Sequence, residues 1–335
     1  MEFPHWLAAV ALIVASGCRR DVPAPACALA QSAAVKTNAN DAEASRSLPA
    51  DASPAPYAVA DAETLPDASA PGDEAVEPPP TDMLPVPAGV FTMGADSGGQ
   101  EDEHPAHAVR VAAFYLDRTE VTNAAWTECV SAGVCNEKSE AVRSQHPDFN
   151  GPDQPVSGVS WDDARAYCAW RKKRLPREAE FEKAVRDTDD RRFAWGNEPP
   201  THERTVFSSA RPENVGTHPS GRGAYGHDDL AGNVWEWMQD EYDPFAYRRP
   251  GATEGKPGTC EEIMAALDEL RAAHRQGFTG SNPIPVECEH SIRGGAYNYD
   301  ADGLRATNRV HHPGRFRIPM LGLRCAMDGP LNPRF

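Results

Sequence analysis

One stretch combines groups that bind metal ions with groups that pack, namely GHDDLAGNVWEWMQD from Gly226 to Asp240. Glu236 stands between Trp235 and Trp237, and this alternation is the period-2 pattern of a short strand or extended segment. A carboxylate held between two indole rings needs a partner, because an unpaired buried charge is costly. A metal ion or a buried arginine would each supply one. The alternative is a core turn in which Glu236 only bonds backbone amides.

A second group of polar residues, between positions 101 and 107, also has the chemistry of metal ligands. It contains three acids and two histidines: Glu101, Asp102, Glu103, His104 and His107. The two histidines lack the i, i+4 spacing that places a pair on one helical face. We therefore expect this segment to be a solvated polar loop.

The cysteines suggest an oxidising compartment. Of the eight in the chain, six fall in the part rich in tryptophan, glycine and proline: Cys129, Cys135, Cys168, Cys260, Cys288 and Cys325. An even number suits up to three disulfides, and no CxxC or Cys/His zinc spacing is present. Cys129 and Cys135 can close a short loop, and Cys260 and Cys288 bracket a segment that looks inserted. Six cysteines permit fifteen pairings, so these pairs are hypotheses.

The stretch from Pro155 to Arg186 has the clearest helix pattern. Ser160 or Asp162 is expected to cap a helix that runs to about Lys172. Four of its residues share one face at helical spacing, so its cysteine should point inward: Ala164, Tyr167, Cys168 and Arg171. The LPREAEF segment predicts a second helix, with Pro176 near its first turn.

Three further elements are expected before this stretch. Residues 84–95 alternate apolar and polar positions and predict a strand with a turn. Residues 109–117 predict a single strand. Thr122 is placed to cap a helix that begins at Asn123.

Residues 243–289 look like an insertion. Their proline- and glycine-rich start leads into CEEIMAALDELRAAH, which has an apolar helical stripe of four residues: Ile263, Met264, Leu267 and Leu270. We expect this helix to dock on the domain, with Cys260 and Cys288 joining its ends.

The first eighteen residues indicate export. Residues 6–15 form an apolar run that is too short for a membrane span and is placed like the core of a signal peptide. The run leads to Ala-Ser-Gly-Cys18, which resembles a bacterial lipobox. We expect residues 1–18 to be a signal peptide with lipidation at Cys18, which would anchor the protein to the cell envelope. A cleaved signal peptide without lipid, giving a periplasmic or secreted protein, and a cytoplasmic protein are the alternatives.

Composition divides the rest of the chain into two parts. Residues 19–82 are rich in alanine, proline and aspartate and contain one aromatic residue, Tyr57, so they predict a disordered linker. Residues 83–328 predict one large globular domain. The net charge of −17 argues against a nucleic-acid partner, because no basic patch compensates for it.

The motifs of residues 83–328 resemble the formylglycine-generating enzyme (sulfatase-modifying factor) family. The motifs follow the family order: PAGVFTMGA, VTNAAW, PVSGVSWDDARAYCAWRKKRLPREAEFEKA, AWGN, DDLAGNVWEW, IRGGAY, LRATNR and LGLRCA. The resemblance implies an α+β domain related to C-type lectins, with little regular secondary structure and bound structural calcium. It also implies a disulfide between Cys168 and Cys325.

The family's second calcium site takes side chains and carbonyls from a pattern that four residues here match: Asp229, Gly232, Val234 and Glu236. Oxygen ligands from one acidic turn are what a hard cation selects, with water filling the remaining positions. The family's first calcium site has no matching pattern in residues 203–213.

The family's enzyme binds Cu(I) through two cysteines shortly after the RGG motif and oxidises a substrate cysteine with oxygen. Two soft thiolates are what Cu(I) requires. Here the residues from Ala296 to Arg305 include no cysteine, and the region is about three residues shorter, so we expect no copper site. Residues that could carry altered acid/base chemistry near this segment are Tyr297, Tyr299, Asn308, Arg309 and His311.

Two hypotheses follow. The first is a non-catalytic, calcium-stabilised binding or scaffold domain of an envelope lipoprotein, with an envelope protein or peptide as partner and a lipid anchor in the membrane. The tether and single domain look most like lipoprotein members of the superfamily. The second is an oxidoreductase-type enzyme of the same family with altered active-site chemistry.

Overall fold

The computed structural model describes residues 81–249, 251–256, 258–272 and 284–329. Its α-helices are α1 (Asn123–Ser131), α2 (Glu140–Gln145), α3 (Trp161–Trp170), α4 (Glu178–Arg186) and α5 (Cys260–Ala272). Its strands are β1 (Met83–Val86), β2 (Gly89–Met93), β3 (His107–Val111), β4 (Phe114–Asp117), β5 (Trp235–Glu241), β6 (His290–Arg293), β7 (Val310–His312), β8 (Leu321–Gly322) and β9 (Ala326–Asp328). The predicted lipidation site Cys18 and nearly all of the predicted linker lie outside the described residues.

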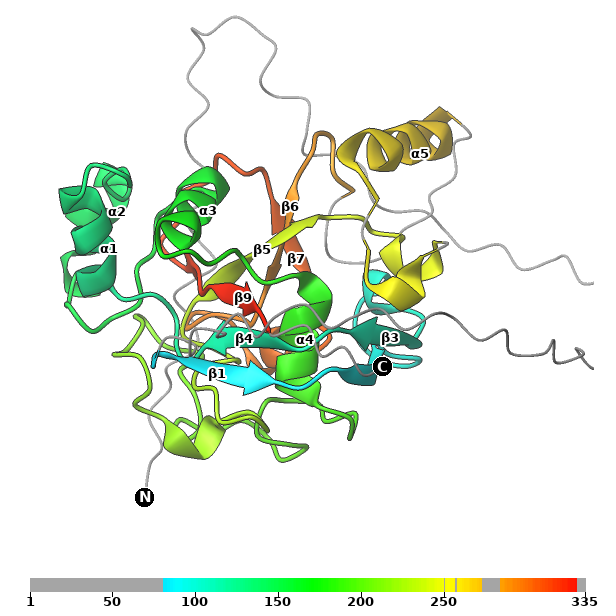
Figure 1. The fold of residues 1–335 in the computed structure, drawn as a ribbon, viewed down its shortest axis with the longest axis horizontal. Helices are drawn as coiled ribbons and strands as arrows, with labels where there is room; N and C mark the ends of the chain where they lie inside the picture. Colours follow the sequence, from blue (N-terminus) through cyan, green and yellow to red (C-terminus); the bar gives the residue numbers. More distant parts are fainter. Residues whose placement is uncertain (1–80, 250, 257, 273–283, 330–335) are drawn as a thin grey trace, which may run out of the picture. The chain divides into compact units, whose positions relative to one another are not determined.

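The strands form three small sheets. The largest has the order β7-β6-β5-β8, in which β8 is parallel to β5 and the other pairs are antiparallel. The second has the order β1-β4-β9, and the third pairs β2 with β3. Helices α1 and α2 lie at one edge of the ribbon and α5 lies at the opposite edge (Figure 1). Helices and short strands linked by long turns make this a mixed α+β fold.

The prediction of one strand over residues 109–117 is wrong. Val111 pairs with Gly89 in one sheet, whereas Phe114 pairs with Val86 in another. Because the two partners belong to different sheets, the chain must leave β3 and enter β4 across Ala112 and Ala113. The predicted strand in residues 84–95 likewise divides into β1 and β2.

Helix α3 begins where the sequence predicts. Ser160 is the capping residue, and its side chain accepts a hydrogen bond from the backbone N–H of Asp163. Of the predicted inward face, three residues are buried: Ala164, Tyr167 and Cys168. The helix ends at Trp170, two residues earlier than expected, and Lys172 has a positive φ of 60°.

The disulfides join distant parts of this domain. Cys168 on α3 bonds Cys325, directly before β9, across a sequence separation of 157 residues. The other pairs are Cys129–Cys135 and Cys260–Cys288. All three pairs match the pairs expected from the sequence.

Helix α4 is buried along its whole length, charged residues included. Pro176 precedes the helix and does not lie in its first turn, because Arg177 is the residue at the helix N-terminus. Five ionisable side chains of α4 therefore need partners inside the fold: Glu178, Glu180, Glu182, Lys183 and Arg186.

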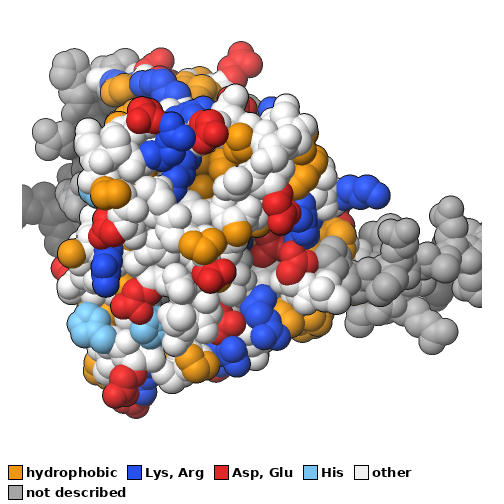
Figure 2. Space-filling view, turned by 90° about the vertical axis from the view of Figure 1, so that its left-hand side faces the viewer, with side chains coloured by type: hydrophobic (Ala, Val, Ile, Leu, Met, Phe, Trp, Pro, Cys, Tyr) orange, Lys and Arg blue, Asp and Glu red, His pale blue; other side chains and the backbone are white. Residues whose placement is uncertain are grey.

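In the helix of the predicted insertion, α5, Ile263 and Leu267 are buried, and Met264 is half-buried. Among the described residues, no helix is both long and apolar enough to cross a membrane. On the face that carries α1, α2 and α3, basic and acidic side chains are interspersed, with apolar side chains scattered between them (Figure 2).

Candidate functional site

The acidic turn before β5 depends on unusual backbone conformations. Asp229, Gly232 and Asn233 have positive φ values of 55°, 92° and 57°. A Cβ atom at Gly232 would overlap Thr205 Oγ1 and the backbone of Val206. Glycine is therefore required at this position both by its conformation and by close packing.

Glu236 is paired with a buried arginine, one of the two partners the sequence allows. Arg324 donates from Nε and from a terminal nitrogen to the two oxygens of Glu236, at 2.7 and 2.8 Å. Both side chains are fully buried. Burial lowers the pKa of Arg324, but the charge and hydrogen bonds of Glu236 outweigh burial and raise it overall. The guanidinium also donates to the carbonyls of Asp228 and Asp229, at 3.1 Å each.

More acid than base is buried around this pair. Asp229 accepts a hydrogen bond from the backbone N–H of Gly216 at 2.6 Å. Glu120 is buried, and within the described part of the chain neither of its carboxylate oxygens has a hydrogen-bond partner. Burial, followed by the negative charge of Asp229, raises the pKa of Glu120 well above its ordinary value. Three carboxylates therefore surround one guanidinium.

The fit of calcium to this turn depends on its oxygen atoms. In the described ranges, no three His, Cys, Asp or Glu side chains lie together as a ready metal site. The expected set does not require three, because Gly232 and Val234 would contribute backbone carbonyls and only Asp229 and Glu236 would contribute carboxylates. Carboxylate oxygens that accept from Arg324 keep further lone pairs. The surplus of buried acid at this turn, including the unpartnered Glu120, suits a cation, so the residues present fit calcium.

The two tryptophans of the motif fix β5 in the core. Trp237 donates from Nε1 to the carbonyl of Val159 at 3.0 Å, which ties the strand to the start of α3. Trp235 packs edge-on against Tyr299, with ring centroids 5.2 Å apart. These contacts hold the backbone on both sides of Glu236.

The segment from Ala296 to Arg305 is tied down by its backbone. Ser208 and Ser209 donate from their N–H groups to the carbonyls of Tyr299 and Tyr297, at 2.8 and 2.7 Å. Tyr297 is 4% exposed and its ring packs edge-on against Phe149, whereas Tyr299 is 38% exposed. Burial raises the pKa of Tyr297 to about 12, so it is a poor acid/base group at neutral pH.

The remaining candidate acid/base residues have structural partners elsewhere. Asn308 donates to the carbonyl of Gly303 at 3.1 Å. Arg309 is fully buried and lies over the ring of Tyr242, on which His311 stacks at 4.0 Å. The structure therefore brings Arg309 and His311 together at Tyr242, whereas Tyr297 and Tyr299 pack against other rings.

A buried ionic network holds α4 against the sheet. Arg309 donates two hydrogen bonds to Glu178 at 2.7 and 2.9 Å, and Arg293 pairs with Glu178 and Glu182. Burial raises the pKa of Glu178, but Arg309 and Arg293 outweigh burial and hold it below the ordinary range. Arg293, which precedes the two glycines of the IRGGAY motif, is therefore a charge partner for α4.

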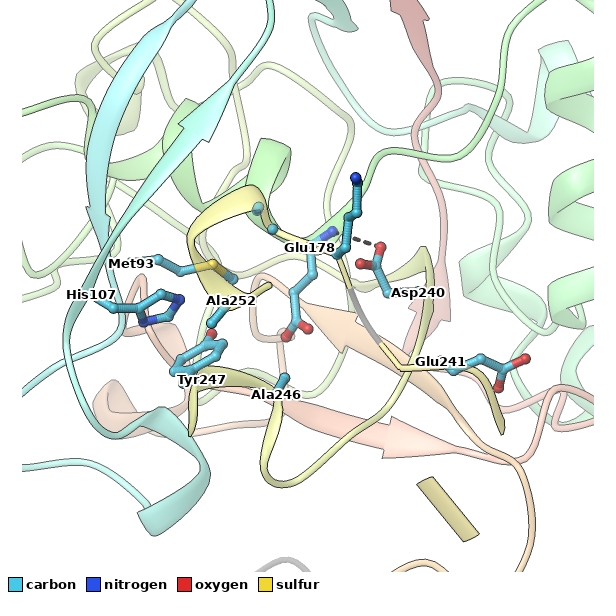
Figure 3. Close-up of a pocket in the computed structure, with 11 residues that line it drawn as sticks. Met93, His107, Glu178, Asp240, Glu241, Ala246, Tyr247 and Ala252 are labelled. Atoms are coloured by element: carbon cyan, nitrogen blue, oxygen red, sulfur yellow. Dashed lines mark hydrogen bonds between the residues drawn. The ribbon is translucent and has the colours of Figure 1, made fainter. Parts of the chain in front are cut away.

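Beside this network lies a small cavity of about 20 Å³, lined by residues that include Glu178, Asp240 and Tyr247 (Figure 3). The backbone N–H of Glu178 donates to Asp240 at 2.9 Å, drawn as a dashed line. Burial and the charge of Glu178 raise the pKa of Asp240 to about 7. A space of this size holds about one water molecule, so it is too small for a substrate.

Sequence reasoning missed two sets of buried acids. The solvated-loop prediction is wrong for Asp102 and Glu103, which are buried. Asp102 accepts from the hydroxyl of Tyr242 at 2.6 Å, and Glu103 pairs with Arg305. Their partners lie far away in sequence, so no local pattern reveals the burial. Glu120 was missed as well, because nothing in its local sequence indicates burial.

Comparison with known proteins identifies the domain. Residues 68–329 match the sulfatase-modifying factor enzyme 1-like domain. Formylglycine-generating enzyme of Bos taurus is 35% identical over 221 residues, covering 48% of this chain and 58% of that enzyme. Hercynine oxygenase of Mycolicibacterium thermoresistibile is 30% identical over 274 residues, covering 71% of this chain and 57% of that enzyme. The chain thus spans a little over half the length of these relatives.

Solved structures show the same fold. PvdO from Pseudomonas aeruginosa superposes with a TM-score of 0.56 at 24% identity, covering 74% of this chain and 94% of that chain. Treponema denticola variable protein 1 superposes with a TM-score of 0.53 at 20% identity, covering 74% of this chain and 95% of that chain. Because the domain match extends over most of the sequence, the chain belongs to the sulfatase-modifying factor enzyme 1-like domain family.

Proposed function

We propose that this protein is a binding or scaffold protein of the bacterial envelope and does not generate formylglycine. One observation carries the proposal: Ala296 to Arg305, where the family's copper enzyme has two cysteines, contains none. The six cysteines of the described domain are paired in disulfides, and a disulfide sulfur is not the thiolate that Cu(I) requires. The residues present therefore do not fit copper.

A peptide assay tests this proposal. The purified protein, supplied with Cu(I) and oxygen, is incubated with a sulfatase-type cysteine peptide, and aldehyde formation is followed by mass spectrometry. A family enzyme that has the cysteine pair serves as positive control. We expect no aldehyde above the protein-free background, and turnover above background would overturn the proposal.

Calcium is part of the proposed function as a structural ion. The ligands would be the side chains of Asp229 and Glu236 and the carbonyls of Gly232 and Val234. When bound, the ion would neutralise buried carboxylate charge and fix the turn before β5. Metal analysis of purified protein, with thermal unfolding before and after EDTA treatment, tests this part. Bound calcium and a lower Tm in EDTA are expected; protein without calcium and indifferent to EDTA would refute it.

Export with lipidation at Cys18 completes the proposal. Three disulfides in the described domain support an oxidising compartment. The lipid would tether the domain to the membrane, and the partner would be an envelope protein or peptide and not a nucleic acid. Mass spectrometry of the mature N-terminus tests the tether. A lipid-modified Cys18 is expected, whereas an unmodified N-terminus at another residue would refute the anchor.

A second candidate function is an oxidoreductase-type enzyme with altered chemistry. The observation in its favour is the similarity to hercynine oxygenase, which extends over 71% of this chain. The same metal analysis separates the two candidates. Stoichiometric iron or copper, in place of calcium, would favour the enzyme.

A further inference from the structure

Glu120 is buried in a place where no side chain of the described residues pairs directly with its charge. It lies just before Val121, whose backbone donates to Leu323 and accepts from Val156, at 2.9 and 2.8 Å. The side chain is 2% exposed, and both carboxylate oxygens are without a hydrogen-bond partner among the described residues. An isolated carboxylate in such a place is strongly unfavourable.

The neighbouring charges make the ionised form of Glu120 still less favourable. Asp229 and Glu236 both repel it, and Arg324 is the positive charge that attracts it most. Both oxygens of Glu236 already hold that guanidinium. One arginine cannot balance three buried carboxylates, so one further cation of charge +2 would bring the group to neutrality.

Protonation of Glu120 does not remove the problem. It would cancel the charge, but among the described residues neither oxygen has a hydrogen-bond partner that could accept from the new O–H group. The next residue, Val121, accepts a backbone hydrogen bond from Val156 at 2.8 Å, and Val156 precedes Ser157. In the described part of the chain the Oγ atom of Ser157 is also buried without a partner.

We propose that Glu120 belongs to the cation centre of Asp229 and Glu236, as an outer carboxylate that holds cation-bound water. The proposal rests on the calcium site proposed above and adds to it a residue outside the DDLAGNVWEW motif. Calcium takes six to eight oxygen ligands and completes its shell with water, which an unpartnered carboxylate can orient. A role through water agrees with the described residues, in which no three acidic side chains form a complete metal site.

Calcium titration of the purified chain tests the role of Glu120. Wild type, Glu120→Gln and the control Glu128→Gln are stripped with EDTA and titrated with Ca²⁺ by calorimetry, and their Tm is measured with and without Ca²⁺. Glu128 is exposed on α1, so it supplies the same chemical change away from the centre. We expect Glu120→Gln to raise the Kd for Ca²⁺ about 10- to 100-fold, as loss of outer-shell partners typically does. Glu128→Gln should leave the Kd unchanged.

The rise in Tm on adding Ca²⁺ separates this role from a purely structural one. Ca²⁺ should raise the Tm of wild type more than the Tm of Glu120→Gln, whatever the two values are in EDTA. A purely structural role would change both Tm values of the variant by the same amount. If Glu120→Gln does not accumulate, Glu120→Asp keeps the charge and withdraws it by one methylene, and we expect it to raise the Kd as well.

Two results overturn the inference in different ways. If wild type binds Ca²⁺ and the variant at position 120 has the wild-type Kd, the calcium site stands and Glu120 has no part in it. That result would assign the unpaired oxygens to buried water. If wild type neither binds Ca²⁺ nor responds to it in Tm, the inference and the proposed calcium site both fail.

Discussion

Arg324 and Glu236 form a two-fold hydrogen-bonded ion pair in the core, although 88 residues separate them in the sequence. The pair joins β5 to the segment between β8 and β9. Arg324 therefore neutralises Glu236 of the WEW motif, whether or not a cation also lies beside it. The stability of the domain should therefore depend on both members of this pair.

Replacement of Arg324 by methionine should destabilise the domain strongly. The change leaves Glu236 buried without its partner, which typically costs about 3–5 kcal/mol. Urea unfolding of Arg324→Met against wild type measures the loss. The control is Arg315→Met, which breaks an exposed pair with Glu287 and should have no measurable effect. Equal effects of the two variants would contradict the importance of burial.

The three disulfides should differ in their contributions. Loss of Cys168–Cys325 frees a far longer loop than loss of Cys260–Cys288, with sequence separations of 157 and 28 residues. Loop-closure entropy alone makes the first bond worth about 1.5 kcal/mol more. Paired Cys→Ala variants, compared by urea unfolding, test this order. Reactive thiols at positions 260 and 288 in exported protein would show that the second bond does not form.

Asp240 should make stability fall as pH rises from about 4 to 7. Burial, followed by the charge of Glu178, raises its folded-state pKa to about 7, so the folded state binds the extra proton. Its contribution is complete below the ordinary pKa and is lost as pH rises through 7, by roughly 4 kcal/mol at most. Asp240→Asn should remove this component. Urea unfolding of both proteins at several pH values measures how the free energy of unfolding depends on pH. The same pH dependence in wild type and Asp240→Asn would refute the assignment.

Glycine at position 232 should be indispensable. Gly232→Ala adds a Cβ that overlaps Thr205 and Val206 in a left-handed conformation, so the loss should exceed the roughly 1 kcal/mol of the conformation alone. Gly98→Ala is the matched control, because Gly98 also has a positive φ, of 70°, but has open space around it. Thermal unfolding compares them. A similar Tm for both variants would show that packing at Gly232 is relaxed.

The sequence alone determined the features that are encoded locally. Ser160 begins α3 because its side chain caps the helix, and the period-2 pattern of Trp235 and Trp237 is a strand. Eight motifs in order identified the family. These features depend on neighbouring residues or on the order of motifs along the chain, and both can be read from the sequence.

Only the tertiary structure decided which charges meet. Glu236 needed either a cation or an arginine, and the arginine that reaches it comes from the last motif of the chain. Asp102 was expected in water, yet the fold buries it against Tyr242, 140 residues away. Glu120 has no local signal at all. Such pairings arise from chain topology, because burial and distance are set by strands that come together only when the domain folds.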